Sequence, residues 1–484
     1  MHPDVPPPDL PAGSLSRPQP PQQTAGRRVF WSNFDCEWEW AAIGNSNGRS
    51  AGHATGPAGE PSDPQPARAS RVLQSAAEKT RRWCTELAWS WLPMARPGDL
   101  IVCGGGSVAS LSPVWSTDLP TAVWQGLEWG TGLPEGWKGR LVPWGWTPSA
   151  RTLARQGSDP APAPLSEVLA EVVAEVNARS RRWEWEQELG LALPGSRPIA
   201  SVGELASALR ALPDAGAGWV VKANFGMSGR EAIRGRGTTV TEPHRRFVEQ
   251  RLEATGPLVL EPWLTAVAEA GVQWEIAPEG TVTLVGVAEQ RVAGGTWQGS
   301  RFSGRTSSDD WREAIDATGR VARRVAAAGY WGPLGIDCMR YRDATGVERL
   351  RPLQDLNARF TMGRLTLAWR EHLPAGWSAA WRVIPPHAAE AVRMWCEHLG
   401  TARDDSRLAW RTTPGIKPGF TPGITPTPVT GSAIRTSTHA AATDSGRGES
   451  FPGGRCLLAA ADDHRLDLLE HEFDALLERA RPPA

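Results

Sequence analysis

The chain of 484 residues has little lysine, widely separated cysteines and no long apolar run. Its lysines are Lys79, Lys138, Lys222 and Lys417, so arginine supplies nearly all of the positive charge. The six cysteines form no C-x-x-C pair, which argues against a zinc finger or a disulfide framework. No apolar stretch is long enough to cross a bilayer, and the proline-rich start lacks the apolar segment of a secretory signal. These absences predict a cytoplasmic protein with reduced cysteines.

The charge balance excludes two classes of partner. A formal net charge of −1 gives no electrostatic basis for binding nucleic acid or an anionic membrane, and the arginines do not gather into a basic run. We therefore expect neither nucleic acid nor a membrane as the main partner.

Composition and hydrophobic periodicity divide the chain into segments. Stretches rich in Pro, Gln, Gly and Ser predict disorder or flexible loops, and a β-α-β order in the first third predicts a small α/β domain. The central part predicts two consecutive α+β lobes, with one helix from Ser166 to Glu188 and a long helix from Asp309 to Ala328, capped by Ser308 and ended by Gly329. The predicted segments are a disordered start (1–26), an α/β domain (27–155) with a flexible insert (44–68), a two-lobed domain (165–400, lobes about 190–257 and 258–375), a flexible linker (401–452) and a closing strand and helix (453–484).

A predicted hairpin near residue 340 carries three oxygen side chains. Strands over 334–342 and 347–356, joined by a turn that ends in glycine, would bring Asp337 beside Asp355 and Asn357. Two carboxylates and an amide oxygen suit Mg²⁺, which also takes phosphate oxygens and water as ligands. The alternative is a turn-capping Asp and a solvated Asp-Leu-Asn loop entry.

The run VVKANFGMSGRE at 220–231 places a lysine at a strand end before a glycine loop. Lys222 would reach the phosphates of a nucleotide, and Gly226, Ser228 and Gly229 would fold over them. The order is strand, glycine loop, strand, so the run is neither a Walker A sequence nor a dinucleotide fingerprint. The alternative is a plain glycine-rich hairpin turn with a solvated lysine.

A strand at 258–260 runs into a candidate hinge, Glu261, Pro262, Trp263 and Leu264. A nucleobase between two lobes needs a linker whose backbone N–H and C=O groups read its edge, and a nearby acid such as Glu269 can take the ribose hydroxyls. The alternative is a strand end with a solvated Glu.

The order of these pieces resembles the ATP-grasp superfamily of carboxylate-amine and carboxylate-thiol ligases. The resemblance covers about 165–375, and the superfamily's late motif, an acid on one strand and acid-x-Asn-x-Arg on the next, matches Asp337 and 355–359. It implies an α/β and α+β fold class, with a small pre-ATP-grasp-like α/β domain before a two-lobed ATP-grasp fold. Among the branches of this superfamily, the motifs EPW and NARFTMG are most similar to those of peptide ligases.

The resemblance also implies ATP and Mg²⁺ as cofactors and a role for each matching residue. Arg359 and Lys222 would act in catalysis, with Arg359 facing the γ-phosphate or the acyl phosphate. For the first basic residue, Arg181 and Arg182 compete with Arg179, which we choose. The implied metal ligands are Asp337, Asp355 and Asn357, and the implied nucleotide-binding residues are Arg179, Lys222, Gly226, Ser228, Gly229, Glu261, Pro262, Trp263, Leu264 and Glu269.

The implied activity is an ADP-forming ligase that joins a small-molecule carboxylate to an amine, such as an amino acid or peptide. Arg291, Arg301 and Arg305 are candidates for holding the acceptor carboxylate, or are surface charges. One departure is Asp355, because the family most often has Glu at that position. Two alternatives stay open, an ATP-binding module without turnover and a small-molecule kinase that uses the same site. A homodimer is also open.

Overall fold

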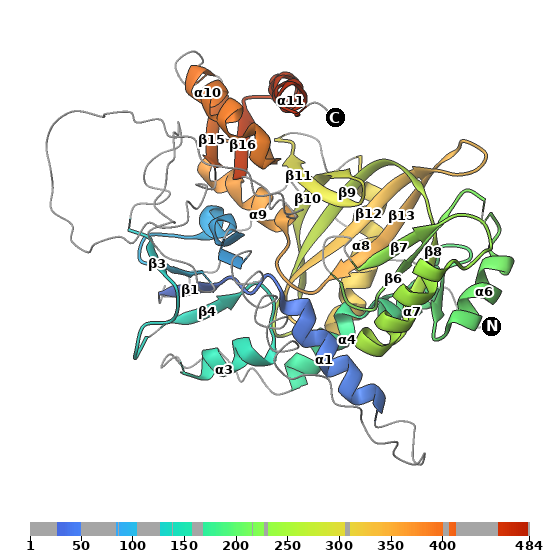
Figure 1. Cartoon of the computed structure of the whole chain (residues 1–484). Helices are drawn as coiled ribbons and strands as arrows, with labels where there is room; N and C mark the ends of the chain where they lie inside the picture. The colour runs from blue at the N-terminus through green and yellow to red at the C-terminus, as the bar shows by residue number, and fades with distance from the viewer. Residues whose placement is uncertain are drawn as a thin grey trace, which may run out of the picture.

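The computed structural model describes residues 27–49, 84–85, 87–103, 126–137, 139–156, 168–214, 216–226, 231–304, 310–399, 406–412 and 454–482. Within these ranges the strands form three sheets, of four, eight and four strands. Figure 1 shows the first sheet (β1 to β4) on one side, the large sheet in the centre and the small sheet with β6 to β8 on the other side. The mixed α/β and α+β fold class predicted from the sequence is confirmed.

The first sheet is parallel, with strand order β3-β2-β1-β4. Its buried face packs on Trp91 in a 3₁₀ helix. Apolar spacing over Ser70–Leu92 predicts one α-helix; of that range the structure describes 84–85 and 87–92, and 88–92 belong to the 3₁₀ helix instead. The elements are β1 (Arg28–Trp31), α1 (Cys36–Arg49), η1 (Ala88–Met94), β2 (Leu100–Val102), β3 (Glu128–Gly130), β4 (Arg140–Pro143) and α3 (Pro148–Gln156).

The helix predicted over 166–188 is two helices, α4 (Val168–Asn177) and α5 (Arg179–Glu188), so the prediction of one helix is wrong. Ala178 between them is extended, with φ −70° and ψ 125°. Two contacts fix the break: the Arg179 N–H donates to the Asn224 carbonyl (3.0 Å), and the Asn177 side chain accepts from the Ala358 N–H (2.9 Å). Apolar spacing predicts the first half only, since the second half, RSRRWEWEQE, is mostly charged, and no local pattern marks the break between them.

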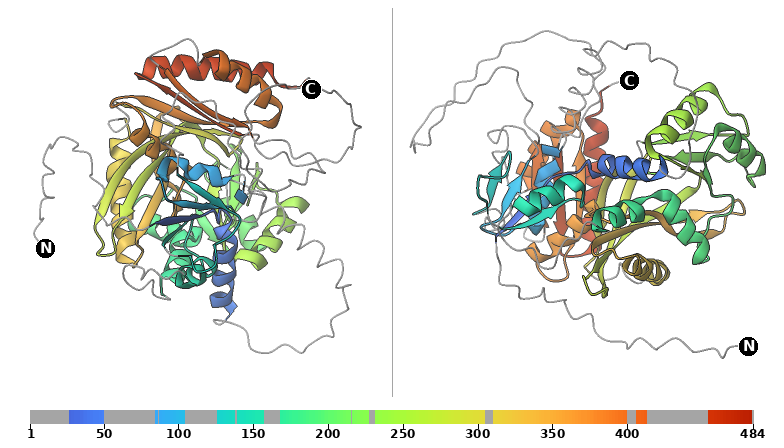
Figure 2. Two further views of the ribbon diagram at one scale, coloured as in Figure 1. Left: turned by 90° about the vertical axis from the view of Figure 1, so that its left-hand side faces the viewer. Right: turned by 90° about the horizontal axis from the view of Figure 1, so that it is seen from below.

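The small sheet has strand order β5-β8-β6-β7 and is antiparallel throughout. Two helices pack on it around a core that includes Leu205, Leu209 and Trp219, and Ser201 caps the first helix by accepting from the Glu204 N–H. Figure 2 shows this lobe set apart from the first sheet. The elements are β5 (Arg197–Ile199), α6 (Val202–Ala211), β6 (Trp219–Lys222), β7 (Ala232–Gly235), α7 (Glu242–Thr255) and β8 (Leu258–Pro262).

The large sheet has strand order β13-β12-β9-β10-β11-β14-β16-β15. The long helix α8 packs on it through Trp311, Val321 and Val325, as the sequence predicts, and Gly329 with φ 89° ends the helix region. Ser308 lies outside the described residues. The elements are β9 (Thr265–Ile276), β10 (Val282–Ala293), β11 (Thr296–Phe302), α8 (Arg312–Ala327), β12 (Gly332–Arg342), β13 (Glu348–Asn357), α9 (Met362–Ala368), η4 (Trp369–His372), β14 (Ser378–Ile384), η5 (Pro386–Ala388), α10 (Ala389–Leu399), β15 (Ser406–Thr412), β16 (Gly454–Ala460) and α11 (Asp463–Arg479).

One face of β9 packs on α8, and the other face lies next to Asp337. Trp274 donates its indole N–H to Thr318 of α8 (3.2 Å), so side chains of the same parity on β9 face the helix. Gly271 and Glu269 therefore lie on the opposite face. Asp337 of β12 pairs directly with Gly271 and lies on that face too. Figure 1 shows α8 behind this part of the sheet.

The turn between β12 and β13 is held by Asp343. Its Oδ1 accepts from the N–H groups of Thr345 (2.9 Å) and Val347 (3.0 Å), and its Oδ2 accepts from Arg349 (3.0 Å). These hydrogen bonds, the Thr345 hydroxyl first, lower the pKa of Asp343 to about 2.

We expect Asp343→Ala to loosen this turn and to speed amide hydrogen exchange at Thr345 and Val347. Since the folded-state pKa is below the ordinary 3.8, the Asp343 contribution is complete above about pH 4 and is lost as the pH falls through 2. Exchange measured by mass spectrometry at pH 7 checks the effect. Equal exchange in both proteins would remove the side chain from any part in the turn.

Candidate functional site

Three oxygen side chains meet where β12 and β13 lie side by side. Asp337 is the direct cross-strand partner of Asp355, and Gly335 is that of Asn357, so all three side chains share one face of the sheet. The Asn357 amide donates to Asp337 Oδ2 (3.1 Å). The geometry predicted from the sequence hairpin is therefore present, although the role of these residues stays a prediction.

Arg179, the first residue of α5, reaches this row from the side. Its Nη2 lies 2.8 Å from Asp355 Oδ2, and its Nη1 donates to the Ala223 carbonyl (2.7 Å) just after β6. Arg181 points elsewhere, toward Glu175 and Glu184. Among the three competing arginines, Arg179 thus lies nearest the carboxylate row.

The two aspartates have opposite titration behaviour. Burial, together with the negative charge of Asp355, raises the pKa of Asp337 to about 6. Burial would also raise the pKa of Asp355, but the positive charges of Arg179 and Lys222 outweigh it and lower the pKa to about 2. The row therefore contains one carboxylate that is ionised at any working pH and a second that a nearby cation would ionise fully.

A buried ion cluster lies next to the row, centred on Glu261. Lys222 Nζ lies 2.8 Å from Glu261 Oε2, Arg351 Nη2 lies 2.7 Å from Glu261 Oε1, and Arg182 also pairs with Oε1. Glu186 lies within 4 Å of both arginines and has no hydrogen-bond partner among the described residues. Three cations thus face two carboxylates.

Charge and burial set the ionisation of this cluster. Burial opposes ionisation of Glu261, but Arg351, Lys222 and Arg182 hold its pKa well below the ordinary range. Burial lowers the pKa of Lys222 and raises that of Glu186. The excess positive charge, at the end of β6, is suited to a polyphosphate.

The hinge and loop candidates lie around this cluster. Glu261 and Pro262 pair with Val220 and Trp219 in the small sheet, and the Trp263 N–H donates to the Gly218 carbonyl (3.0 Å). The Trp263 ring is 39 % exposed and packs against Arg234 at 3.8 Å. Leu264 separates β8 from β9 and is half-buried. The Gly226 carbonyl accepts from Arg179 (3.3 Å), whereas Ser228 and Gly229 lie outside the described residues.

Glu269 lies one row from Asp337, opposite Gln290 on β10. Burial raises the pKa of Glu269, with a contribution from Asp337. The Gln290 amide donates to Asp337 Oδ1 (2.6 Å). A side chain on Gly271 would fall within 3 Å of this amide, so the glycine keeps space beside the carboxylate.

Arg359 turns toward α1. Its Nη2 lies 2.9 Å from Glu37 Oε1 in α1, and its Nη1 donates to the Phe360 carbonyl (3.0 Å). Two other arginines considered for the acceptor carboxylate are engaged with the C-terminal helix: Arg291 pairs with Asp474, and Arg301 with Asp467 and Glu470. Arg291 and Arg301 therefore form ion pairs with α11. Arg305 lies outside the described residues.

The donor set fits Mg²⁺. Within the described ranges no three His, Cys, Asp or Glu side chains gather as a metal site, so a cation would rely on two carboxylates, one amide oxygen and ligand oxygens. Mg²⁺ is commonly bound in this way, through one or two carboxylates plus phosphate and water. Asp337, Asp355 and Asn357 would hold the ion.

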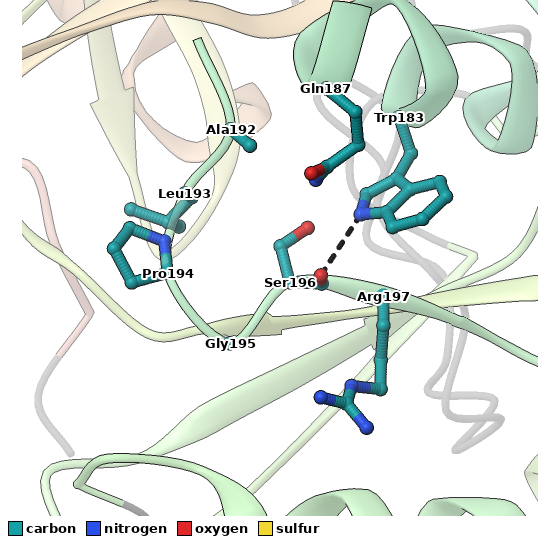
Figure 3. Close-up of a pocket in the computed structure, with 8 residues that line it drawn as sticks. All are labelled: Trp183, Gln187, Ala192, Leu193, Pro194, Gly195, Ser196 and Arg197. Atoms are coloured by element: carbon teal, nitrogen blue, oxygen red, sulfur yellow. Dashed lines mark hydrogen bonds between the residues drawn. The ribbon is translucent and has the colours of Figure 1, made fainter. Parts of the chain in front are cut away.

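A surface recess of 470 Å³ lies on another face of α5. Figure 3 shows Trp183 and Gln187 facing the loop 192–197, with the Trp183 indole donating to the Ser196 carbonyl (2.9 Å). None of the candidate site residues lines it, so the recess is separate from the carboxylate row.

Among the residues that the structure describes, no helix has the length and hydropathy of a bilayer span.

Two antiparallel lobes, a lysine at the end of β6 and an oxygen row on β12 and β13 occur in the order that the sequence resemblance implies. This is the arrangement that the resemblance to the ATP-grasp superfamily predicts. Four residues of the site are not predicted from the sequence: Glu37, Glu186, Gln290 and Arg351. Arg351 had a signal, since it precedes Asp355 by an even number of residues on one strand. Glu37 had none.

No family model and no curated protein matches the chain. Among solved structures, N5-carboxyaminoimidazole synthetase from Staphylococcus aureus is 9 % identical with a TM-score of 0.46, over 81 % of this chain and 94 % of that one. The synthase from Aspergillus clavatus in complex with ADP and 5-aminoimidazole ribonucleotide is 12 % identical with a TM-score of 0.46, over 82 % and 96 %. L-amino acid ligase from Bacillus licheniformis is 12 % identical with a TM-score of 0.43, over 94 % and 98 %. A likeness of this size assigns none of their substrates to this chain.

Proposed function

We propose that the chain is an ATP-dependent ligase that forms an amide or peptide bond through an acyl phosphate. The observation that carries this proposal is the row of Asp337, Asp355 and Asn357 beside the Lys222 cluster. Arg179 contacts both Asp355 and the Ala223 carbonyl, which follows Lys222 in the chain. A divalent cation and a cationic cluster side by side are what a triphosphate needs.

The proposed chemistry has two steps. A carboxylate oxygen of the first substrate attacks the γ-phosphorus, and the bond to ADP breaks. The amine nitrogen of the second substrate then attacks the acyl carbon, phosphate leaves, and the nitrogen loses a proton. Such transfers depend on positioning and charge neutralisation, and they need no side-chain nucleophile.

This chain's own groups divide the work. Lys222 binds phosphate oxygens, for which it exchanges part of its contact with Glu261. Arg179 orients Asp355, and Arg359 faces the phosphate that leaves. When bound, Mg²⁺ neutralises charge on the phosphates. The backbone of Glu261 to Leu264 and the Glu269 carboxylate bind the nucleoside.

An ADP-release assay with Mg-ATP and pooled amino acids tests the proposal. The expected result is amino-acid-dependent release of ADP and free phosphate in equal amounts, with an amide product in the mass spectrum. Nucleotide binding without amino-acid-dependent ADP would identify an ATP-binding module instead. ADP without phosphate or amide would identify a small-molecule kinase.

A further inference from the structure

Glu37 of α1 forms an ion pair with Arg359, the arginine to which the proposed function gives a catalytic role. Arg359 lies two residues after the end of β13, the strand that carries Asp355 and Asn357. Its guanidinium Nη2 lies 2.9 Å from Glu37 Oε1. Both side chains are nearly buried, at 13 % and 9 % exposure. The Glu37 charge is among the groups that raise the pKa of Arg359 against the effect of burial. The pair therefore joins α1 to the end of β13.

The backbone around this pair is fixed on both sides. On one side, the Phe360 N–H donates to the Trp144 carbonyl (3.0 Å), and the Arg359 guanidinium lies 5.7 Å from the Trp144 ring. On the other side, Asn33 binds the Trp144 N–H (2.9 Å) and the Gly145 carbonyl (2.7 Å) just ahead of α1. Glu37 and Arg359 therefore cannot move far apart without breaking the hydrogen bonds at Trp144.

The close packing leaves little room at α1. A side chain on Gly145 would lie 2.7 Å from Cys36 Sγ and 2.9 Å from the Trp40 ring. Cys36 Sγ in turn contacts Glu37 Oε2 (3.4 Å), which holds the second carboxylate oxygen. The orientation of Glu37 is thus set by packing within the first domain, before any ligand binds.

We infer that Glu37 is the positioning residue of Arg359, so that the first domain supplies part of the catalytic centre. This inference rests on the proposed ligase function. A guanidinium has five N–H donors. One of them, at Nη1, donates to the Phe360 carbonyl, and Nη2 forms an ion pair with Glu37. Glu37 holds one edge of the fork, and the remaining donors meet the acyl phosphate. An arginine without this support would sample several rotamers.

Glu37→Gln tests the inference in the full-length chain, with Glu39→Gln as the matched control. Glu39 lies on the same helix and bonds Ser149 of its own domain rather than Arg359. We expect Glu37→Gln to lower kcat about 10- to 100-fold, the usual effect of removing an orienting partner, with unchanged KM for ATP and amine. Glu37→Asp should restore part of kcat, and Glu39→Gln should match the wild type.

Three results would overturn the inference. Wild-type kcat in Glu37→Gln would show that Arg359 needs no support from α1. A raised KM for the amine with wild-type kcat would assign Glu37 to amine binding. Equal losses in Glu37→Gln, Glu37→Asp and Glu39→Gln would reflect general damage to α1. Absence of amino-acid-dependent ADP release in the wild type would overturn the proposed function itself, which separates the two failures.

Discussion

Asp337→Asn should abolish Mg²⁺-dependent nucleotide binding and lower turnover by about 100-fold or more, because an amide replaces a charged ligand at the cation. Asp337 lies directly opposite Asp355, so the two carboxylates can share one cation. Thermal-shift measurements with Mg-ADP, together with the ADP-release assay, check both effects. Unchanged stabilisation by nucleotide and unchanged turnover would show that the metal assignment is wrong.

The same variant should fold at least as well as the wild type. The folded-state pKa of Asp337 is raised to about 6 from 3.8, so its ionised form lowers the stability of the metal-free protein at neutral pH. An uncharged Asn removes that effect. Asp343→Asn, at the far end of the same hairpin, is the matched control and should keep nucleotide binding. An unfolded Asp337→Asn protein would contradict this account of the site.

Glu261→Gln should lower the free energy of unfolding by about 3–5 kcal/mol, the cost of leaving buried charges without their partner. Lys222, Arg182 and Arg351 all contact this carboxylate, which is fully buried. Urea unfolding at pH 7 measures the difference. Glu188→Gln is the control, because Glu188 and Arg324 form an exposed pair of the kind that contributes about 0–1 kcal/mol.

The effect of Glu261 should also depend on pH. The folded-state pKa lies well below the ordinary 4.5, so the contribution is complete above that value and is lost as the pH falls further. The difference in the free energy of unfolding between the wild type and Glu261→Gln should therefore become smaller between pH 5 and pH 3. A Glu261→Gln protein as stable as Glu188→Gln would mean that the cluster is not a stabilising element.

The sequence predicts well what short-range patterns determine. The hairpin around Asp343, the helix ended by Gly329 and the strand before Lys222 occur where alternation, helical spacing and turn residues place them. The row of Asp337, Asp355 and Asn357 could be predicted because the pairing of two neighbouring strands brings these residues together. The fold class followed from these elements and their order.

The sequence does not reveal what depends on contacts between distant segments. The break at Ala178 depends on Asn224 and Ala358, which no local pattern connects to it. The partners of Glu261 come from α5, β6 and β13, so a residue that resembles a solvated strand end is the centre of a buried cluster. Glu37 is one of two acids on α1, and only the fold brings it to Arg359.

A crystal structure with Mn²⁺ and ADP tests the central claim most directly, because Mn²⁺ replaces Mg²⁺ and scatters anomalously. We predict an anomalous peak bonded to Asp337 and Asp355 and to a phosphate oxygen, at about 2.0–2.3 Å, with Lys222 on the phosphates. A nucleotide bound elsewhere, or a metal peak that neither aspartate contacts, would contradict the account.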